Sequence, residues 1–188
     1  KKLMKKNIYV LSFNYGQKHS KELEMALWQT KQLNQVVEHK IIDLTFFSEL
    51  LDGSSALVKG GNEVPDLKNL TDGQRKQPPT YVPNRNMVLL SLCASYAESK
   101  KCNEIYYGAQ AQDEYGNWDC TSEFLNKIND ILKLNRLNKI EIKAPFMNLR
   151  KVEELKIGIE LNVDFSKTWS CYKGFEKHCG ECPTCVER

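Results

Sequence analysis

Short apolar runs alternate with amphipathic segments along most of the chain. Residues 8–13 form a β-branched and aromatic run that ends at Asn14, which predicts a buried strand followed by a turn. Similar runs predict strands at residues 36–44, 104–108 and 140–144. Apolar spacing predicts helices from Ser20 onward and at residues 45–50, 85–99, 121–134 and 150–161. This alternation predicts an α/β fold, a parallel sheet with helices on both faces.

Several polar segments interrupt this pattern. Ligands bind beyond the carboxyl ends of the strands in such sheets, so residues 14–19, the segment ending at Asn86 and residues 109–120 are expected to converge on one crevice. Residues 52–80 are polar and aperiodic and contain several glycines and prolines, which is typical of a lid or a disordered insert.

Composition excludes several classes of protein. The 188 residues are 41% hydrophobic and 27% charged, which is a globular balance and not that of a disordered chain. Lys and Arg number 27 against 24 Asp and Glu, so no excess of basic residues indicates nucleic-acid binding. The longest apolar stretch, residues 87–97, predicts a buried helix and no membrane span. No apolar run follows the charged start, so no signal peptide is predicted and a cytoplasmic protein is expected.

Four of the seven cysteines lie close together near the end of the sequence: Cys171, Cys179, Cys182 and Cys185. In a cytosolic protein this spacing favours a metal over disulfides. Four thiolates close a tetrahedral shell around Zn²⁺ without an open position, so we expect a structural zinc site. His178 is expected to be a solvated turn residue because the cysteines already fill the shell, and Cys93 is expected to be a core residue.

A zinc-stabilised nucleic-acid-binding module is an alternative of another class. The lysines near the cysteines are nearly offset by Glu176, Glu181 and Glu187, so no basic stripe supports it. We expect the cluster to attach the C-terminal segment to the sheet.

Two loops carry side chains suited to chemistry. Residues 80–86 lead directly into a helix, and Arg85 and Asn86 stand where amide N–H groups and the helix dipole favour an anion. The alternative is that Asn84 merely caps the helix and Arg85 pairs with a surface acid. The second loop can bind a polar heterocycle or can be a solvated loop. Its polar and aromatic residues are Gln110, Gln112, Asp113, Glu114, Tyr115, Asn117, Trp118 and Asp119.

Several motifs taken together resemble the 7-cyano-7-deazaguanine synthase family of the queuosine pathway. They are NYGQKHSKELE at residues 14–24, TYVPNRN at 80–86, EFL at 123–125, IKAPFMNL at 142–149 and TWSCYKG with CGECPTC at 168–174 and 179–185. The resemblance spans nearly the whole chain. It implies an adenine-nucleotide α-hydrolase type of PP-loop fold and a zinc-bound, ATP-dependent carbon–nitrogen ligase, with Mg²⁺ accompanying ATP.

The resemblance also implies a set of site residues. Arg85 is expected to clamp an anion. The substrate-binding or catalytic residues implied near the deazaguanine are Tyr81, Pro83, Asn86, Asp113 and Asp119. The backbone of Leu11, Ser12 and Phe13 is expected to face adenine, and Gly108 and Arg85 are implied in ATP binding.

The sequence departs from the family pattern in two places. The family's strand and SGGxDS phosphate loop do not precede residue 8, so we expect residues before Lys1 to supply them. In the loop that usually reads NAxDxSGYPDCRPEF, Gln110, Tyr115, Trp118 and Thr121 differ. A related ligase that stops at the amide, or joins a deazaguanine carboxylate to another amine, is therefore an alternative function.

The expected organisation has two parts. Residues 1–165 are predicted to form the nucleotide-binding domain, and residues 166–188 a zinc-binding tail packed on it. Partners are expected to be small molecules, namely 7-carboxy-7-deazaguanine, ammonia and ATP, and a second copy in a homodimer. Neither a membrane nor direct nucleic-acid binding is expected.

Overall fold

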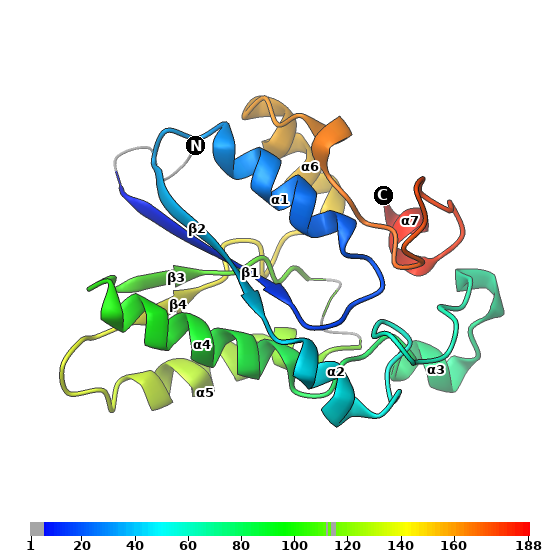
Figure 1. The fold of residues 1–188 in the computed structure, drawn as a ribbon, viewed down its shortest axis with the longest axis horizontal. Helices are drawn as coiled ribbons and strands as arrows, with labels where there is room; N and C mark the ends of the chain where they lie inside the picture. Colours follow the sequence, from blue (N-terminus) through cyan, green and yellow to red (C-terminus); the bar gives the residue numbers. More distant parts are fainter. Residues whose placement is uncertain (1–5, 112, 114–115) are drawn as a thin grey trace. The chain divides into compact units, whose positions relative to one another are not determined.

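The computed structural model describes residues 6–111, 113 and 116–188 (Figure 1). Contacts divide the chain into two compact units. Unit 1 contains residues 1–74, 79–83 and 159–188, and unit 2 contains residues 75–78 and 84–158. The predicted division into a nucleotide-binding domain, residues 1–165, and a zinc-binding tail, residues 166–188, concerns function and stays a prediction.

Unit 1 is built on two parallel strands, β1 (Ile8–Asn14) and β2 (Val36–Asp43). The connecting helix α1 (Lys21–Lys31) packs against both strands, as Figure 1 shows. Helix α2 (Thr45–Leu51) follows β2. Two parallel strands joined by a helix form the crossover unit that the sequence pattern predicts.

Residues 52–80 are folded onto unit 1 over part of their length, which corrects the expectation of a disordered insert. Leu57 and Val58 are fully buried, and the Lys18 N–H donates to the Leu57 carbonyl oxygen at 2.8 Å. The Ala56 N–H donates to the carbonyl oxygen of Pro79 at 2.8 Å. The segment also contains a 3₁₀ turn, η1 (Leu67–Asn69), and α3 (Asp72–Lys76). A short apolar stretch, Ala56 to Val58, anchors the otherwise polar sequence.

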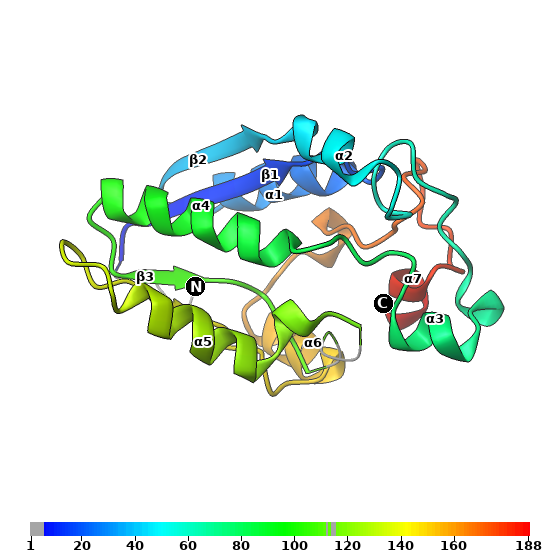
Figure 2. The ribbon, with the colours of Figure 1, turned by 90° about the horizontal axis from the view of Figure 1, so that it is seen from below.

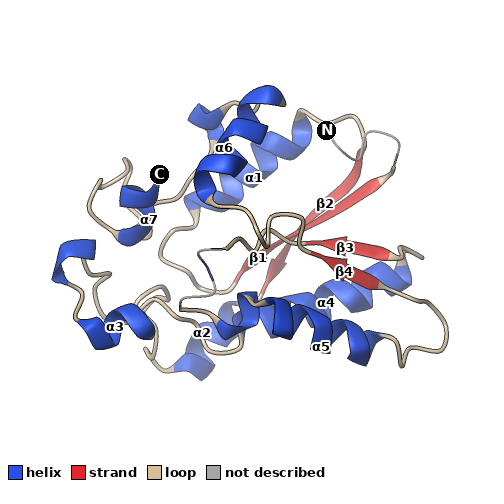
Figure 3. Cartoon of the chain, turned by 180° about the vertical axis from the view of Figure 1, so that it is seen from behind, coloured by secondary structure: helices blue, strands red, loops and turns tan. Residues whose placement is uncertain are grey.

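Unit 2 contains α4 (Arg85–Ser99), β3 (Glu104–Tyr106), α5 (Ser122–Leu132) and β4 (Glu141–Lys143). Strands β3 and β4 are parallel, and the two helices run alongside them (Figures 2 and 3). The core of this unit consists of Leu90, Ala94, Ala97, Ile105, Phe124, Ile128, Ile140 and Ile142. These side chains come from all four elements, so one hydrophobic core fixes the positions of the strand ends and of the loops that follow them.

Parallel strands with packed helices confirm the predicted α/β class, and α4 begins and ends where the sequence places it. The other elements differ from expectation by a few residues. The remaining elements are η3 (Trp118–Cys120), α6 (Lys151–Glu160), η4 (Phe165–Lys167) and α7 (Pro183–Glu187). Within the described residues, no helix combines the length and apolarity needed to cross a membrane.

Candidate functional site

The four predicted cysteines of unit 1 lie together at the start of α7. The Sγ atoms of Cys171, Cys179, Cys182 and Cys185 all lie within 4.8 Å of one another, and Cys171 and Cys182 are fully buried. Sγ atoms of Cys179 and Cys185 are 3.9 Å apart. A tetrahedral Zn²⁺ with Zn–S bonds of about 2.3 Å separates its sulfurs by about 3.8 Å. The cluster therefore has the donor type and spacing of a closed four-thiolate site.

Backbone amides favour ionisation of one thiol. Burial would raise the pKa of Cys179, but N–H groups of Cys182 and Glu181, at 3.3 and 3.4 Å from its sulfur, outweigh burial and lower this pKa to about 7. A thiolate is the form of cysteine that binds a metal. His178 is exposed and stacks on Trp169 with ring centroids 4.2 Å apart, while its Nδ1 lies 3.8 Å from Cys185 Sγ. Its position outside the ligand set stays a prediction.

The cysteine segment is attached to the rest of unit 1 by polar contacts. Lys173 Nζ lies 2.6 Å from Asp66 Oδ1, and the Leu67 N–H donates to the Glu181 carbonyl oxygen at 3.0 Å. Gly174 packs so closely on Lys18 that an added Cβ would overlap the Lys18 carbonyl oxygen. The segment thus supports the loop that follows β1.

The predicted adenine-facing residues Leu11, Ser12 and Phe13 lie in β1 and pair in parallel with Lys40, Ile41 and Ile42 of β2. Ser12 Oγ lies 2.9 Å from His39 Nε2. Tyr81 and Pro83 also belong to unit 1, in the segment 79–83. Their roles stay predictions.

The loop after β1 is held by its own polar side chains. Gly16 has φ of +78° and lies against Ser48, so a side chain there would be strained and would overlap Ser48. Gln17 is buried, accepts a hydrogen bond from the Tyr15 N–H at 2.8 Å and donates to Glu22 at 3.0 Å. Buried hydrogen bonds of this kind fix the backbone beyond the strand end.

In unit 2, an acidic side chain occupies the amino end of α4. Asp119 is 2% exposed, and its Oδ2 accepts a hydrogen bond from the Asn86 N–H at 2.9 Å. Asn84, whose φ is +55°, precedes the helix but makes no capping hydrogen bond with its side chain. Asn84 therefore occupies the N-cap position without a side-chain capping bond, and Asp119 supplies the anion at this helix end.

The next residue of η3 binds the same asparagine. Asn86 Nδ2 donates to Cys120 Sγ at 3.1 Å. Burial, together with the Asp113 and Asp119 charges, raises the pKa of the Cys120 thiol to about 12, so the thiol is neutral near pH 7. Two consecutive residues of η3 thus fix both the backbone and the side chain of Asn86.

Asp119 and Arg85 interact electrostatically at this helix end. Burial raises the pKa of the Asp119 carboxyl, while the Asn86 N–H and the positive charge of Arg85 act in the opposite direction. The structure thus brings together three of the predicted site residues, Arg85, Asn86 and Asp119. A buried carboxylate beside a guanidinium can bind N–H groups and anionic groups of one ligand.

The remaining predicted residues of unit 2 follow β3. Asp113 accepts the Gln110 N–H at 3.0 Å through Oδ2 and donates its own N–H to the Gln110 carbonyl oxygen at 3.0 Å. Space around Gly108 is open, because an added Cβ would meet nothing within 4 Å. The predictions for Gln112, Glu114 and Tyr115 lie outside the described residues. Whether all three predicted loops share one crevice stays a prediction.

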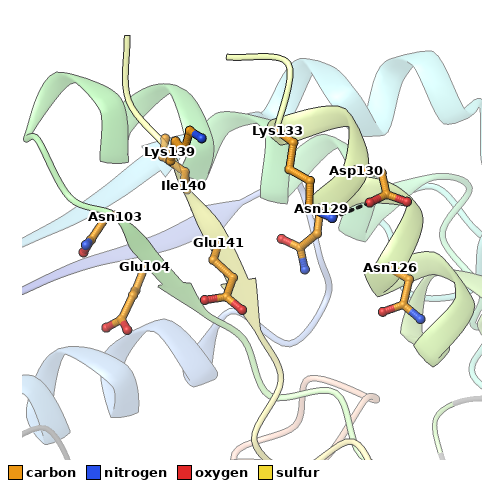
Figure 4. Close-up of a pocket in the computed structure, with 9 residues that line it drawn as sticks. All are labelled: Asn103, Glu104, Asn126, Asn129, Asp130, Lys133, Lys139, Ile140 and Glu141. Carbon is orange, nitrogen blue, oxygen red and sulfur yellow. Dashed lines mark hydrogen bonds and ion pairs between the residues drawn. The ribbon is translucent and has the colours of Figure 1, made fainter. Parts of the chain in front are cut away.

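A surface pocket of about 670 Å³ lies at the amino ends of β3 and β4, opposite the strand ends that lead to the predicted site residues of unit 2 (Figure 4). It is lined by Asn103, Glu104, Asn126, Asn129, Asp130, Lys133, Lys139, Ile140 and Glu141. Lys133 Nζ pairs with Asp130 at 2.7 Å, and Asn129 hydrogen-bonds the backbone of Ile142. The pocket lies at the amino ends of the strands, away from the end where α/β proteins bind their ligands.

Sequence reasoning missed Tyr107 and the capping role of Asp119. Tyr107 lies in the strand predicted at residues 104–108, and its hydroxyl is buried without a hydrogen-bond partner among the described residues. A tyrosine directly before Gly108 at a strand's carboxyl end is the signal that could have marked it. Asp119 accepts the N–H of Asn86, 33 residues earlier, and no local pattern encodes such a contact.

Comparison with known proteins gives one consistent result. The chain matches the sequence model of the family described as queuosine biosynthesis protein QueC over residues 1–188. It is 49% identical to the 7-cyano-7-deazaguanine synthase of Caldicellulosiruptor saccharolyticus over 180 residues, which are 96% of this chain and 77% of that protein. It is 42% identical to the enzyme of that name from Marinomonas sp. over 182 residues, covering 97% and 80% of the two chains.

A third relative is more distant but covers the chain equally well. The 7-cyano-7-deazaguanine synthase 1 of Colwellia psychrerythraea is 41% identical over 188 residues, which cover 97% of this chain and 81% of that protein. Identity of this level over nearly the whole chain accompanies a common fold. The chain belongs to the queuosine biosynthesis protein QueC family.

Proposed function

We propose that the protein is an ATP-dependent carbon–nitrogen ligase that converts 7-carboxy-7-deazaguanine and ammonia to 7-cyano-7-deazaguanine. The observation that carries this proposal is the match to the family over residues 1–188, with relatives of that name at 41–49% identity. The substrate is activated twice, first at its carboxylate to form an amide and then at the amide oxygen to form the nitrile.

The first half of the reaction forms the amide. A carboxylate oxygen attacks the α-phosphorus of ATP, and pyrophosphate leaves to give an acyl adenylate. Ammonia then attacks the carbonyl carbon, AMP leaves, and the nitrogen loses a proton. Both steps need a carboxylate oriented against a neutralised phosphate, which is a task for positioned donors and not for a nucleophilic side chain.

The second half removes the oxygen. The amide oxygen attacks the α-phosphorus of a second ATP, and pyrophosphate leaves again. Loss of AMP, together with the remaining protons on nitrogen, leaves the carbon–nitrogen triple bond of the nitrile. The same positioned donors serve both halves because each begins with an oxygen of the substrate attacking the same phosphorus.

Arg85 is the residue we assign to the anion. It begins α4, at the end of the helix where the helix dipole favours negative charge, and its own charge acts on the buried Asp119 carboxyl. Asp119 and Asp113 are assigned to the N–H groups of the deazaguanine ring, because carboxylates accept hydrogen bonds from such groups. Tyr81, Pro83 and Asn86 complete the proposed substrate site.

The nucleotide and metal assignments are part of the same proposal. Leu11, Ser12, Phe13 and Gly108 are assigned to ATP, which is expected to bind with Mg²⁺. The four cysteines are assigned to Zn²⁺, since their spacing fits a closed thiolate shell. The metal would stabilise the fold and take no part in the reaction. The homodimer and the cytoplasmic location stay predictions.

Incubation of the full-length protein with ATP, ammonium and 7-carboxy-7-deazaguanine, followed by mass spectrometry, tests the function. A nitrile product and two AMP per turnover are expected. Amide as the final product would instead identify a related ligase that stops halfway. Absence of any ATP consumption would contradict the ligase assignment itself.

A further inference from the structure

Tyr107 combines an anchored ring with a hydroxyl that no described group satisfies. The ring packs against the core of unit 2, and the Tyr107 N–H extends the strand pairing by donating to the Lys143 carbonyl oxygen at 3.1 Å. The hydroxyl is buried and has no hydrogen-bond partner among the described residues. A phenylalanine would fill the core equally well, so packing explains the ring but not the hydroxyl.

Gln110, three residues after Tyr107, presents a second such atom. The residue is 6% exposed, and its side-chain oxygen is buried without a partner within the described part of the chain. Its backbone, in contrast, is fully bonded to Asp113 through the N–H and the carbonyl group. Buried polar atoms are almost always hydrogen-bonded in native proteins, so two exceptions within four residues call for a ligand or a water.

The surroundings of Tyr107 tie these atoms to the proposed substrate site. Burial first, and then Cys120, Asp119 and Asp113, raise the pKa of the Tyr107 hydroxyl. The hydroxyl therefore keeps its proton at physiological pH and is a hydrogen-bond donor. Asp119 and Asp113 are the carboxylates already assigned to the deazaguanine ring.

We propose that the Tyr107 hydroxyl and the Gln110 side-chain oxygen recognise the lactam edge of the deazaguanine ring. Tyr107 donates to the ring carbonyl oxygen, and Gln110 accepts from a ring N–H. This inference rests on the proposed function and deepens it, because it assigns the residues that select the ring.

One donor, the Tyr107 hydroxyl, and one acceptor, the Gln110 oxygen, allow the site to select a guanine-type ring over an adenine-type ring. A guanine-type edge presents a carbonyl oxygen beside an N–H, whereas an adenine-type edge presents an amino group beside an acceptor nitrogen. A buried site built to bond the first is left with unpaired groups by the second, which is the strongest form of discrimination available to a binding site. Tyr107 and Gln110 would thus exclude adenine-type rings, ATP's own base included.

Calorimetric binding of 7-carboxy-7-deazaguanine to Tyr107→Phe tests the hydroxyl. The dissociation constant is expected to rise about tenfold, the typical loss for one buried hydrogen bond. The melting temperature of the free protein is expected not to fall, because the change removes an atom without a partner. Tyr106→Phe is the matched control. That hydroxyl lies on the exposed side and bonds Glu104 at 3.2 Å, so binding should not change.

Two further measurements test the acceptor role of Gln110 and the donor role of Tyr107. Gln110→Met keeps the length of the side chain and removes its oxygen, and it is expected to weaken binding by a similar factor. An analogue with an amino group in place of the ring carbonyl should bind the wild-type protein at least tenfold more weakly than 7-carboxy-7-deazaguanine does. Tyr107→Phe should discriminate less between the two compounds.

The outcomes separate this inference from the proposed function. If Tyr107→Phe binds the substrate as Tyr106→Phe does, the recognition role is overturned while the function stands. A lower melting temperature with unchanged binding would assign the hydroxyl to a buried water and overturn the inference too. A wild-type protein that neither binds nor converts 7-carboxy-7-deazaguanine would contradict the proposed function and this inference with it.

Discussion

The two ends of the parallel pair β3 and β4 differ in how their polar atoms are satisfied. The amino end opens into a pocket of about 670 Å³, yet none of its buried polar atoms lacks a partner among the residues described. The carboxyl end leaves the Tyr107 hydroxyl and the Gln110 side-chain oxygen without one. The proposed binding end thus rests on unmet hydrogen-bonding capacity and not on the size of a pocket.

This difference separates polar residues that hold the fold from the polar residues that we propose to bind a ligand. Asn129, at the amino end, bonds the N–H and the carbonyl oxygen of Ile142 at 2.8 and 3.0 Å. Both the nitrogen and the oxygen of its amide bond the protein. A change at the amino end should cost stability, whereas a change at the carboxyl end should cost binding or turnover.

The largest expected loss of stability comes from the cysteine cluster, to which we assign a structural role only. Cys182→Ser is expected to abolish zinc binding and to lower the free energy of unfolding by more than about 4 kcal/mol, because a closed metal site contributes directly to folding. Metal analysis and denaturant titration measure the two effects. The control is Cys102→Ser, a change in unit 2 outside the cluster, and the protein that carries it should retain its full zinc content. A zinc-free Cys182→Ser protein of normal stability would contradict a structural role.

Arg85→Ala tests the carboxyl end by removing the proposed anion clamp. We expect kcat/KM to fall about a thousandfold, as when a positioned charged donor is lost, while zinc content stays the same. Lys133→Ala removes a cation from the amino-end pocket and should leave kcat/KM unchanged. Comparable losses in both variants would erase the distinction between the two ends, and loss of folding in Arg85→Ala would make Arg85 structural.

Asp119→Asn separates activity from stability. Losing the charge should lower kcat/KM about a hundredfold, the smaller end of the range for a positioned group. Because burial raises the pKa of Asp119, the folded state favours the protonated form, and the wild-type protein loses stability as pH rises through that pKa. The neutral amide avoids this loss, so the melting temperature near pH 7 should be unchanged or higher.

The pH dependence of the melting temperature tests whether the Asp119 charge destabilises the folded protein. The stability difference between Asp119→Asn and the wild-type protein should shrink as the pH is lowered and Asp119 becomes protonated. Asp130→Asn, at the exposed amino end, is the matched variant and should retain full activity. A destabilised Asp119→Asn protein at neutral pH would show that the carboxylate is needed as a helix cap more than as a ligand-binding group.

Asn129→Ala is the converse experiment. Two backbone groups of Ile142 would lose their partners, which should lower the free energy of unfolding by about 1–3 kcal/mol. At a temperature where the variant remains folded, kcat/KM should equal that of the wild-type protein. Asn126→Ala, one turn earlier on the exposed side of α5, should change neither quantity. A drop in activity without a drop in stability would place function at the amino end.

Local patterns predicted most of the fold. Periodicity placed α4 at Arg85–Ser99 and located every strand, and cysteine spacing predicted the cluster that the structure assembles. The sequence left residues 52–80 open as a lid or a disordered insert, because the buried apolar residues Ala56 to Val58 and Val64 are too few to leave a periodic signal.

Contacts between distant residues could not be predicted. Asp119 caps a helix that begins 34 positions earlier, and Asn129 bonds a strand 13 positions later. Such partners depend on how packed elements approach one another. The motifs around Arg85 and Asp119 can be read from the sequence, but only the structure shows that Asp119 occupies the end of the helix that carries Arg85.

The amide of Asn129 has a consequence for solubility. A strand edge with open N–H and carbonyl groups is a template on which another chain can add a strand, and it promotes aggregation unless it is covered. Strand β4 is three residues long, and Ile142 is the one whose backbone turns away from β3. One carboxamide from α5 therefore blocks this edge against self-association, a task for which many sheets need an additional strand.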